Sequence, residues 1–158
     1  DRGTRTFGSK IDDSLIETKV AVNVAKASPD LDNNSHIVVT SFNGVVLLAG
    51  QTPRADLKQL AEQTASQVQK VKKVNNELQV IEPSSMLARS NDAWLTSKIK
   101  TEMLTDSAIP GSRIKVVTEN GIVYLLGLLT QAEANRATNL VQGVSGVQKI
   151  VKLFEYID

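Results

Sequence analysis

The stretch that most constrains the fold is residues 114–127, IKVVTENGIVYLLG, in which two apolar runs flank Asn120-Gly121. A two-residue hairpin loop needs positive φ at both central residues, and Asn and Gly adopt that conformation at the lowest steric cost. Residues 37–50, IVVTSFNGVVLLAG, repeat the pattern around Asn43-Gly44. Two hairpins this similar predict a duplicated domain.

Each hairpin is preceded by one segment of helical periodicity and followed by another. The first helices are expected from Asp12 and Asn91, the second over residues 54–68 and 131–144, and closing strands over residues 73–81 and 147–157. Apolar residues at i, i+4 and i+8 give the two first helices matching buried stripes, Ile16/Val20/Val24 and Leu95/Ile99/Met103. The predicted fold is therefore α+β, with each unit running helix–strand–strand–helix–strand.

The closing strand of each unit follows a helical crossover, which brings it parallel to the strand before the helix. We therefore expect a small mixed sheet in each unit, with both helices packed on one face. The strands VVLLAG and IVYLLG are apolar at successive positions, which is typical of strands with both faces covered. The sister unit or a partner could cover the second face.

Turn and cap signals set the expected boundaries. Residues 1–10 are polar and are expected to form a flexible arm. The first domain is expected over residues 11–82, a linker over residues 83–90 and the second domain over residues 91–158. Asp12 or Asp13 is expected to cap the first helix, because a carboxylate accepts from unpaired helix N–H groups. Ser28-Pro29 should end that helix before a loop at residues 31–35, and Thr52-Pro53 and Thr130 should open the later ones.

Composition excludes several classes of function. The formal net charge is +1 over 158 residues, with no basic stripe of the kind that binds nucleic acid. The chain has no cysteine, and its only histidine, His36, belongs to no catalytic sequence motif. No phosphate-binding glycine motif is present. We therefore expect that the protein binds no cofactor and is not an enzyme.

The hairpins FNGVVLLAG and ENGIVYLLG, in this order of elements, resemble the BON domain. With the phrases VLLAGQTP, DAWLTSKIKTEML and VSGVQKIV, residues 11–157 are similar to the tandem-BON envelope lipoproteins of Gram-negative bacteria. The resemblance implies a periplasmic protein that supports envelope integrity and cell division. It also implies attachment to the inner leaflet of the outer membrane through an acylated N-terminal cysteine, which would have to precede residue 1 here. The expected ligand is anionic phospholipid such as phosphatidylglycerol, bound by the second BON domain.

Trp94 is the residue that distinguishes the second unit. On a helical wheel of about 100° per residue, it lies at the edge of the buried stripe beside Lys98, where the first unit has Leu15. Tryptophan is favoured at membrane interfaces because its ring is apolar and its N–H is polar. Two interpretations stay open, in which Trp94 faces lipid or packs between the two units.

The lipid-contact residues that we predict all belong to the first helix of the second unit: Trp94, Leu95, Lys98, Lys100, Thr101, Met103 and Leu104. Arg113 and Lys115 are further candidates for phosphate contacts, whereas Glu102 and Asp106 would oppose them. A few lysines near an anionic surface, each contributing about 1 kcal/mol, give a weak and salt-sensitive association. The rival hypothesis is an envelope protein that binds other proteins or cell-wall components through its apolar strands.

Overall fold

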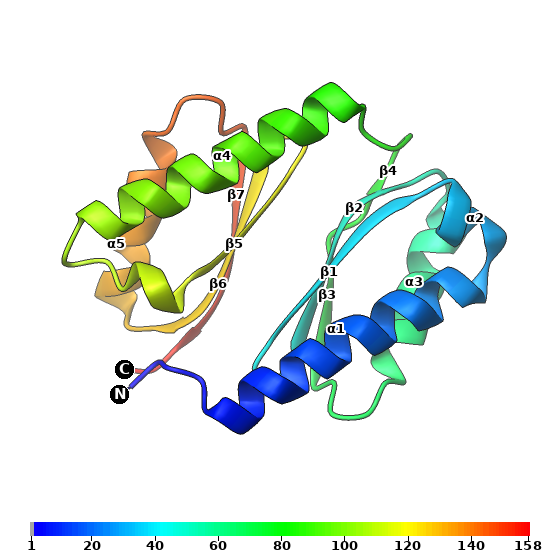
Figure 1. The fold of residues 1–158 in the computed structure, drawn as a ribbon, viewed down its shortest axis with the longest axis horizontal. Coiled ribbons are helices and arrows are strands. Elements are labelled where there is room, and N and C mark those ends of the chain that lie inside the picture. Colours follow the sequence, from blue (N-terminus) through cyan, green and yellow to red (C-terminus); the bar gives the residue numbers. More distant parts are fainter. Residues whose placement is uncertain (1) are drawn as a thin grey trace. The chain divides into compact units, whose positions relative to one another are not determined.

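The computed structural model describes residues 2–158, which divide into two compact units (Figure 1). The first domain comprises residues 5–84, and the second comprises residues 85–158 together with the N-terminal residues up to Thr4. In the second domain, the Arg113 guanidinium donates to the backbone carbonyl of Arg2. Each domain has its own hydrophobic core.

The first domain contains three helices and four strands within its described residues. In chain order they are α1 (Phe7–Ala27), α2 (Pro29–Asn33), β1 (His36–Phe42), β2 (Val45–Thr52), α3 (Ala55–Ser66), β3 (Lys73–Asn76) and β4 (Gln79–Val80). Strand β2 is central, because it pairs antiparallel with β1 and parallel with both β3 and β4.

The second domain repeats this plan. Its elements are α4 (Met86–Thr105), the short 3-10 helix η1 (Gly111–Arg113), β5 (Lys115–Glu119), β6 (Ile122–Leu129), α5 (Gln131–Gln142) and β7 (Lys149–Tyr156). Strand β6 pairs antiparallel with β5 and parallel with β7. The predicted α+β fold, with a helix–strand–strand–helix–strand order and a small mixed sheet in each domain, is confirmed.

Both hairpins turn at the predicted dipeptides. Asn43 and Asn120 each have φ 53°, and Gly44 and Gly121 have φ 80° and 76°. Positive φ at both central positions defines the turn that matches the twist of the flanking strands. The turns thereby fix the registers that pair Phe42 with Val45 and Glu119 with Ile122.

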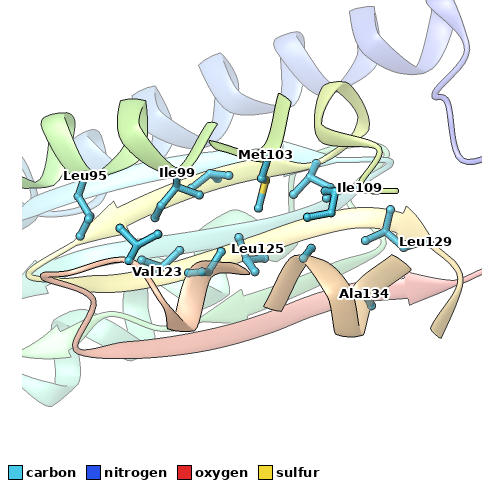
Figure 2. Packing of buried hydrophobic residues seen from close by; sticks show 13 residues of the cluster. Leu95, Ile99, Met103, Ile109, Val123, Leu125, Leu129 and Ala134 are labelled. Atoms are coloured by element: carbon cyan, nitrogen blue, oxygen red, sulfur yellow. The ribbon is translucent and has the colours of Figure 1, made fainter. Parts of the chain in front are cut away.

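The core of each domain lies between its long helices and one face of its sheet. In the second domain, Leu95, Ile99 and Met103 of α4 point onto Val123 and Leu125 of β6 (Figure 2). Ile16, Val20 and Val24 of α1 occupy the matching place in the first domain. Leu47 of β2 and Tyr124 of β6, on the other face of the central strands, are also buried.

In each domain, one buried aspartate joins the long helix to the hairpin turn. Asp13, 2% exposed, accepts hydrogen bonds from the backbone N–H groups of Asn43 (2.7 Å) and Gly44 (2.9 Å). Asp92, 6% exposed, accepts from the corresponding N–H groups of Asn120 (2.8 Å) and Gly121 (3.0 Å). The predicted helix-capping role for Asp12 or Asp13 is wrong, since both lie inside α1.

Asp13 has two further donors, which makes it the more firmly held of the two. The Arg5 guanidinium donates at 2.8 Å and the Ser41 hydroxyl at 2.7 Å, and Arg5 also lies 4.4 Å from the centre of the Phe42 ring. Burial raises the pKa of Asp13 by desolvating its carboxylate. The four donors, Gly44 first among them, more than offset this effect, so the pKa of Asp13 lies below its ordinary value.

The first helix of each domain starts earlier than the sequence predicts. Thr6 caps α1 by accepting from Ser9 N–H, so residues 7–10 are helical and the expected arm ends at Thr6. Ser85 caps α4 by accepting from Ala88 N–H, which leaves only residues 83–85 of the expected linker outside a helix. Both caps were missed because the polar segments before the apolar stripes were assigned to an arm and a linker.

Three smaller predictions also differ from the structure. The expected loop at residues 31–35 contains most of α2, whose Leu31 is buried in the core. Thr52 belongs to β2, and α3 begins at Ala55 after Arg54, which makes no side-chain cap. The first closing strand breaks between β3 and β4, where Leu78 enters the core. The Thr130 cap is confirmed and forms a capping box with Glu133.

We expect Asp13→Ala to destabilise the first domain by about 3 kcal/mol, because it leaves buried N–H donors without an acceptor. Asp12→Ala is the matched control, since Asp12 makes only an exposed pair with Lys70 and should cost less than about 1 kcal/mol. Denaturant unfolding measures both values, and amide exchange at Gly44 locates the effect. Equal losses in the two variants would contradict the role of the buried carboxylate.

The lowered pKa of Asp13 also predicts an acid-sensitive first domain. A depressed folded pKa contributes stability that is present above the unfolded value of about 3.9 and is lost as the pH falls through the folded value. Stability measured between about pH 5 and pH 2 should therefore fall less steeply in Asp13→Asn than in the unmodified chain. Parallel curves would show that Asp13 does not supply the pH dependence.

Candidate functional site

Helix α4 carries a row of exposed apolar side chains opposite its buried stripe. Leu87, Trp94 and Thr101 are seven residues apart and share one face, and all three are exposed. Met86 and Leu104 flank this row and are also exposed. We call these five residues together with Lys98 the α4 outer face.

Trp94 is the centre of the α4 outer face. It is 61% exposed, and the Lys98 ammonium lies 5.0 Å from the centre of its ring. A lysine at this distance from an indole makes a cation–π contact. The face therefore combines an apolar surface with a positive charge held directly over an aromatic ring.

The structure separates the predicted lipid-contact residues into two groups. Trp94, Lys98, Thr101 and Leu104 lie together on the outer face, and the exposed Lys100 lies beside Leu104, about 120° around the helix from Trp94. Leu95 and Met103 are 4% and 1% exposed and belong to the core, so their prediction as surface contacts is wrong. Their other prediction, as members of the buried stripe Leu95/Ile99/Met103, is confirmed.

Met86 and Leu87 are the site residues that sequence reasoning missed, because they were placed in the linker. A serine at position 85, followed by apolar residues seven positions before Trp94, is the signal that could have found them.

Two of the other charged candidates, Arg113 and Asp106, form ion pairs within the domain. Arg113 pairs with Glu133 at 3.0 Å and its side chain is largely buried, so it does not offer a free charge to a phosphate. Lys115 is half-buried at the start of β5. Asp106, expected to oppose an anion, pairs with Arg136 at 3.1 Å. The lysines that remain on α4 are thus Lys98 on the outer face and Lys100 beside it.

A cavity of about 340 Å³ opens next to Trp94. It lies where α4 meets the β5–β6 turn and the connection between α5 and β7. Its lining includes Ala88, Asn91, Asp92, Trp94, Ser145 and Gln148. Apart from Asp92, the side chains that line it are uncharged.

The first domain has a cavity of about 550 Å³ in the same place, beside Asp13 and the Asn43-Gly44 turn. Its character is different, because Lys70 and Lys72 stand where the second domain has Gly146 and Gln148. Helix α1 also exposes apolar side chains, including Leu15 (53%) at the position of Trp94. Exposed apolar surface alone therefore does not distinguish the domains, whereas the tryptophan and the cavity lining without lysines do.

Within residues 2–158, no cluster of three or more His, Asp or Glu side chains is placed to hold a metal ion. None of the helices in that part of the chain combines the length and the hydropathy needed to cross a bilayer.

Comparison with known proteins identifies the family. The family model for the BON domain matches residues 12–82 and 91–158. The chain is 40% identical over 154 residues to outer membrane lipoprotein DolP of Haemophilus influenzae, covering 98% of this chain and 79% of that protein. It is 35% identical to the 21 kDa hemolysin of Actinobacillus pleuropneumoniae, over 97% of this chain and 78% of that protein.

A third relative is the osmotically-inducible protein Y of Escherichia coli, which is 31% identical over 95% of this chain and 75% of its own length. The matches to both halves agree with the repeated hairpins and the repeated order of elements. The chain therefore belongs to the family of BON-domain proteins and carries two BON domains in tandem.

Proposed function

We propose that this protein is a non-enzymatic envelope lipoprotein of the DolP type that docks on anionic phospholipid through the α4 outer face of its second BON domain. Its compartment would be the periplasm, at the inner leaflet of the outer membrane, with attachment through an N-terminal lipid. The name of the relative from Haemophilus influenzae supports the envelope assignment. The proposed binding of phospholipid is supported by the residues of the α4 outer face.

The observation that carries the proposal is the exposed Trp94 with Lys98 over its ring. Tryptophan is stabilised at the boundary between headgroups and acyl chains, where one part of the ring is apolar and its N–H remains in a polar layer. A lysine beside it can reach a lipid phosphate while its aliphatic stem stays on the apolar surface.

Leu87 and Leu104 extend this surface on either side of Trp94, and burying apolar area contributes about 25 cal/mol per Å². Two lysines near an anionic surface add about 1 kcal/mol each. The sum is a modest affinity that suits a domain already held near the membrane by a lipid anchor, since tethering raises its effective concentration.

The second candidate function is binding of other envelope proteins through exposed apolar helices. It is favoured by α1, where Phe7, Ile11, Leu15 and Val22 are all exposed on a comparable face. A protein partner would have no requirement for anionic lipid. Vesicle experiments therefore separate the two candidates.

We expect the fluorescence of Trp94, the only tryptophan of the chain, to shift to the blue when phosphatidylglycerol vesicles are added, with little change for phosphatidylcholine. Trp94→Ala should weaken vesicle affinity about tenfold, because it removes an apolar group that partitions into the interface. The matched control is Leu15→Ala, at the corresponding position of α1, which should change the affinity less than about twofold.

Both side chains are exposed, so neither variant should change the free energy of unfolding by more than about 0.5 kcal/mol. Equal losses of affinity in Trp94→Ala and Leu15→Ala would reject the second domain as the docking domain. A Trp94 spectrum that does not respond to anionic lipid would reject the proposed function.

We also expect Lys98→Glu with Lys100→Glu to weaken binding to anionic vesicles at least about tenfold at low salt, and less at moderate salt, where the attraction is already screened. The control is Lys19→Glu with Lys26→Glu in α1, which makes the same change in net charge in the first domain. Vesicle sedimentation measures the affinity of both double variants at low and at moderate salt. If both double variants lose affinity equally, net charge and not the outer face governs binding.

A further inference from the structure

The aspartate that binds the hairpin turn has all its hydrogen-bond acceptor positions filled in the first domain but not in the second. We call the first carboxylate saturated and the second unsaturated. A carboxylate has about four acceptor positions. Asp13 uses four, two for backbone N–H groups, one for Arg5 and one for Ser41. Asp92 accepts only from Asn120 and Gly121 among the described residues.

The side chains that complete Asp13 have no equivalent around Asp92. Thr118 stands where Ser41 does, yet its hydroxyl is hydrogen-bonded to the Thr96 hydroxyl at 2.8 Å. With α1 and α4 aligned on the two aspartates, the position of Arg5 is taken by Ser84, which lies in the first domain. Asp92 is thus a buried carboxylate with acceptor capacity left over, and it lines the cavity beside Trp94.

The remaining lining of this cavity favours a hydroxyl group. Asn91, Asn120, Ser145 and Gln148 can each donate and accept hydrogen bonds. A hydroxyl also does both, so a diol can donate to Asp92 and accept from the amides around it. An ammonium group only donates, and a phosphate would meet the Asp92 carboxylate at close range in a partly desolvated site.

We propose that the cavity beside Asp92 binds the hydroxyl groups at the tip of a lipid headgroup, as in a glycerol headgroup, while Lys98 contacts its phosphate outside. This inference rests on the proposed function and adds headgroup selection to it. Negative charge on the lipid brings the membrane to the α4 outer face. The unsaturated carboxylate then favours a headgroup that carries hydroxyl donors.

The test compares two lipids of equal charge. Phosphatidylglycerol and phosphatidylmethanol both carry one negative charge, and only the first has hydroxyl groups in its headgroup. At equal mole fractions in phosphatidylcholine vesicles, we expect the chain to bind phosphatidylglycerol about tenfold more tightly, as for hydroxyl donors to a charged acceptor. Equal affinity for the two lipids overturns this inference and leaves the proposed function standing, whereas no affinity for either overturns both.

A blocking variant places the preference in the cavity. Ala88→Leu adds bulk to the cavity lining on a half-buried helical position and should bring the ratio of the two affinities close to one. Its matched control is Ser9→Leu, at the corresponding position of α1 in the first-domain cavity, which should keep the ratio. A preference that survives in Ala88→Leu shows that the hydroxyl groups are recognised elsewhere and overturns the inference.

A second measurement avoids dependence on any variant. Short-chain phosphatidylglycerol, titrated into the unmodified chain, should shift the backbone amide resonances of Asn120 and Gly121, because their acceptor Asp92 gains new donors. Short-chain phosphatidylmethanol should not. A larger shift with short-chain phosphatidylethanolamine would assign the site to an ammonium group and overturn the hydroxyl proposal.

Discussion

The hydrogen bonds between a buried helix aspartate and the Asn-Gly turn hold each BON domain together. A hairpin turn at the edge of a sheet leaves its N–H groups without partners from the ladder, and burial makes that costly. Asp13 and Asp92 satisfy these groups from within α1 and α4. One side chain thereby fixes the long helix against the hairpin, and with it the face that the helix presents outward.

The same interaction differs between the two domains in a way that bears on function. In the first domain, Arg5 pairs with the carboxylate and covers Phe42, so the acceptor positions of Asp13 are filled even though a cavity lies beside the turn. In the second domain, the carboxylate keeps spare acceptor positions beside an open cavity and an exposed tryptophan. The two domains therefore share the interaction with the turn and differ in the number of donors around the aspartate.

Sequence reasoning was most accurate where short-range chemistry decides the structure. Asn-Gly turns, the apolar stripe Leu95/Ile99/Met103 and the Thr130 cap are local patterns with few alternatives. It was least accurate at helix starts and at the site. Thr6 and Ser85 cap α1 and α4 a full turn or more before the predicted starts, and Met86 and Leu87 were consequently assigned to a linker.

The sequence by itself determined that this chain is a duplicated α+β protein with mixed sheets, because hairpin, helix and crossover signals are each written in neighbouring residues. Only the tertiary structure decided the roles of the aspartates and the composition of the outer face. Asp13 and Asp92 find their partners about thirty residues away, at distances of 2.7–3.0 Å that no local pattern encodes. The difference between a saturated and an unsaturated carboxylate depends on which donors the fold brings within that reach.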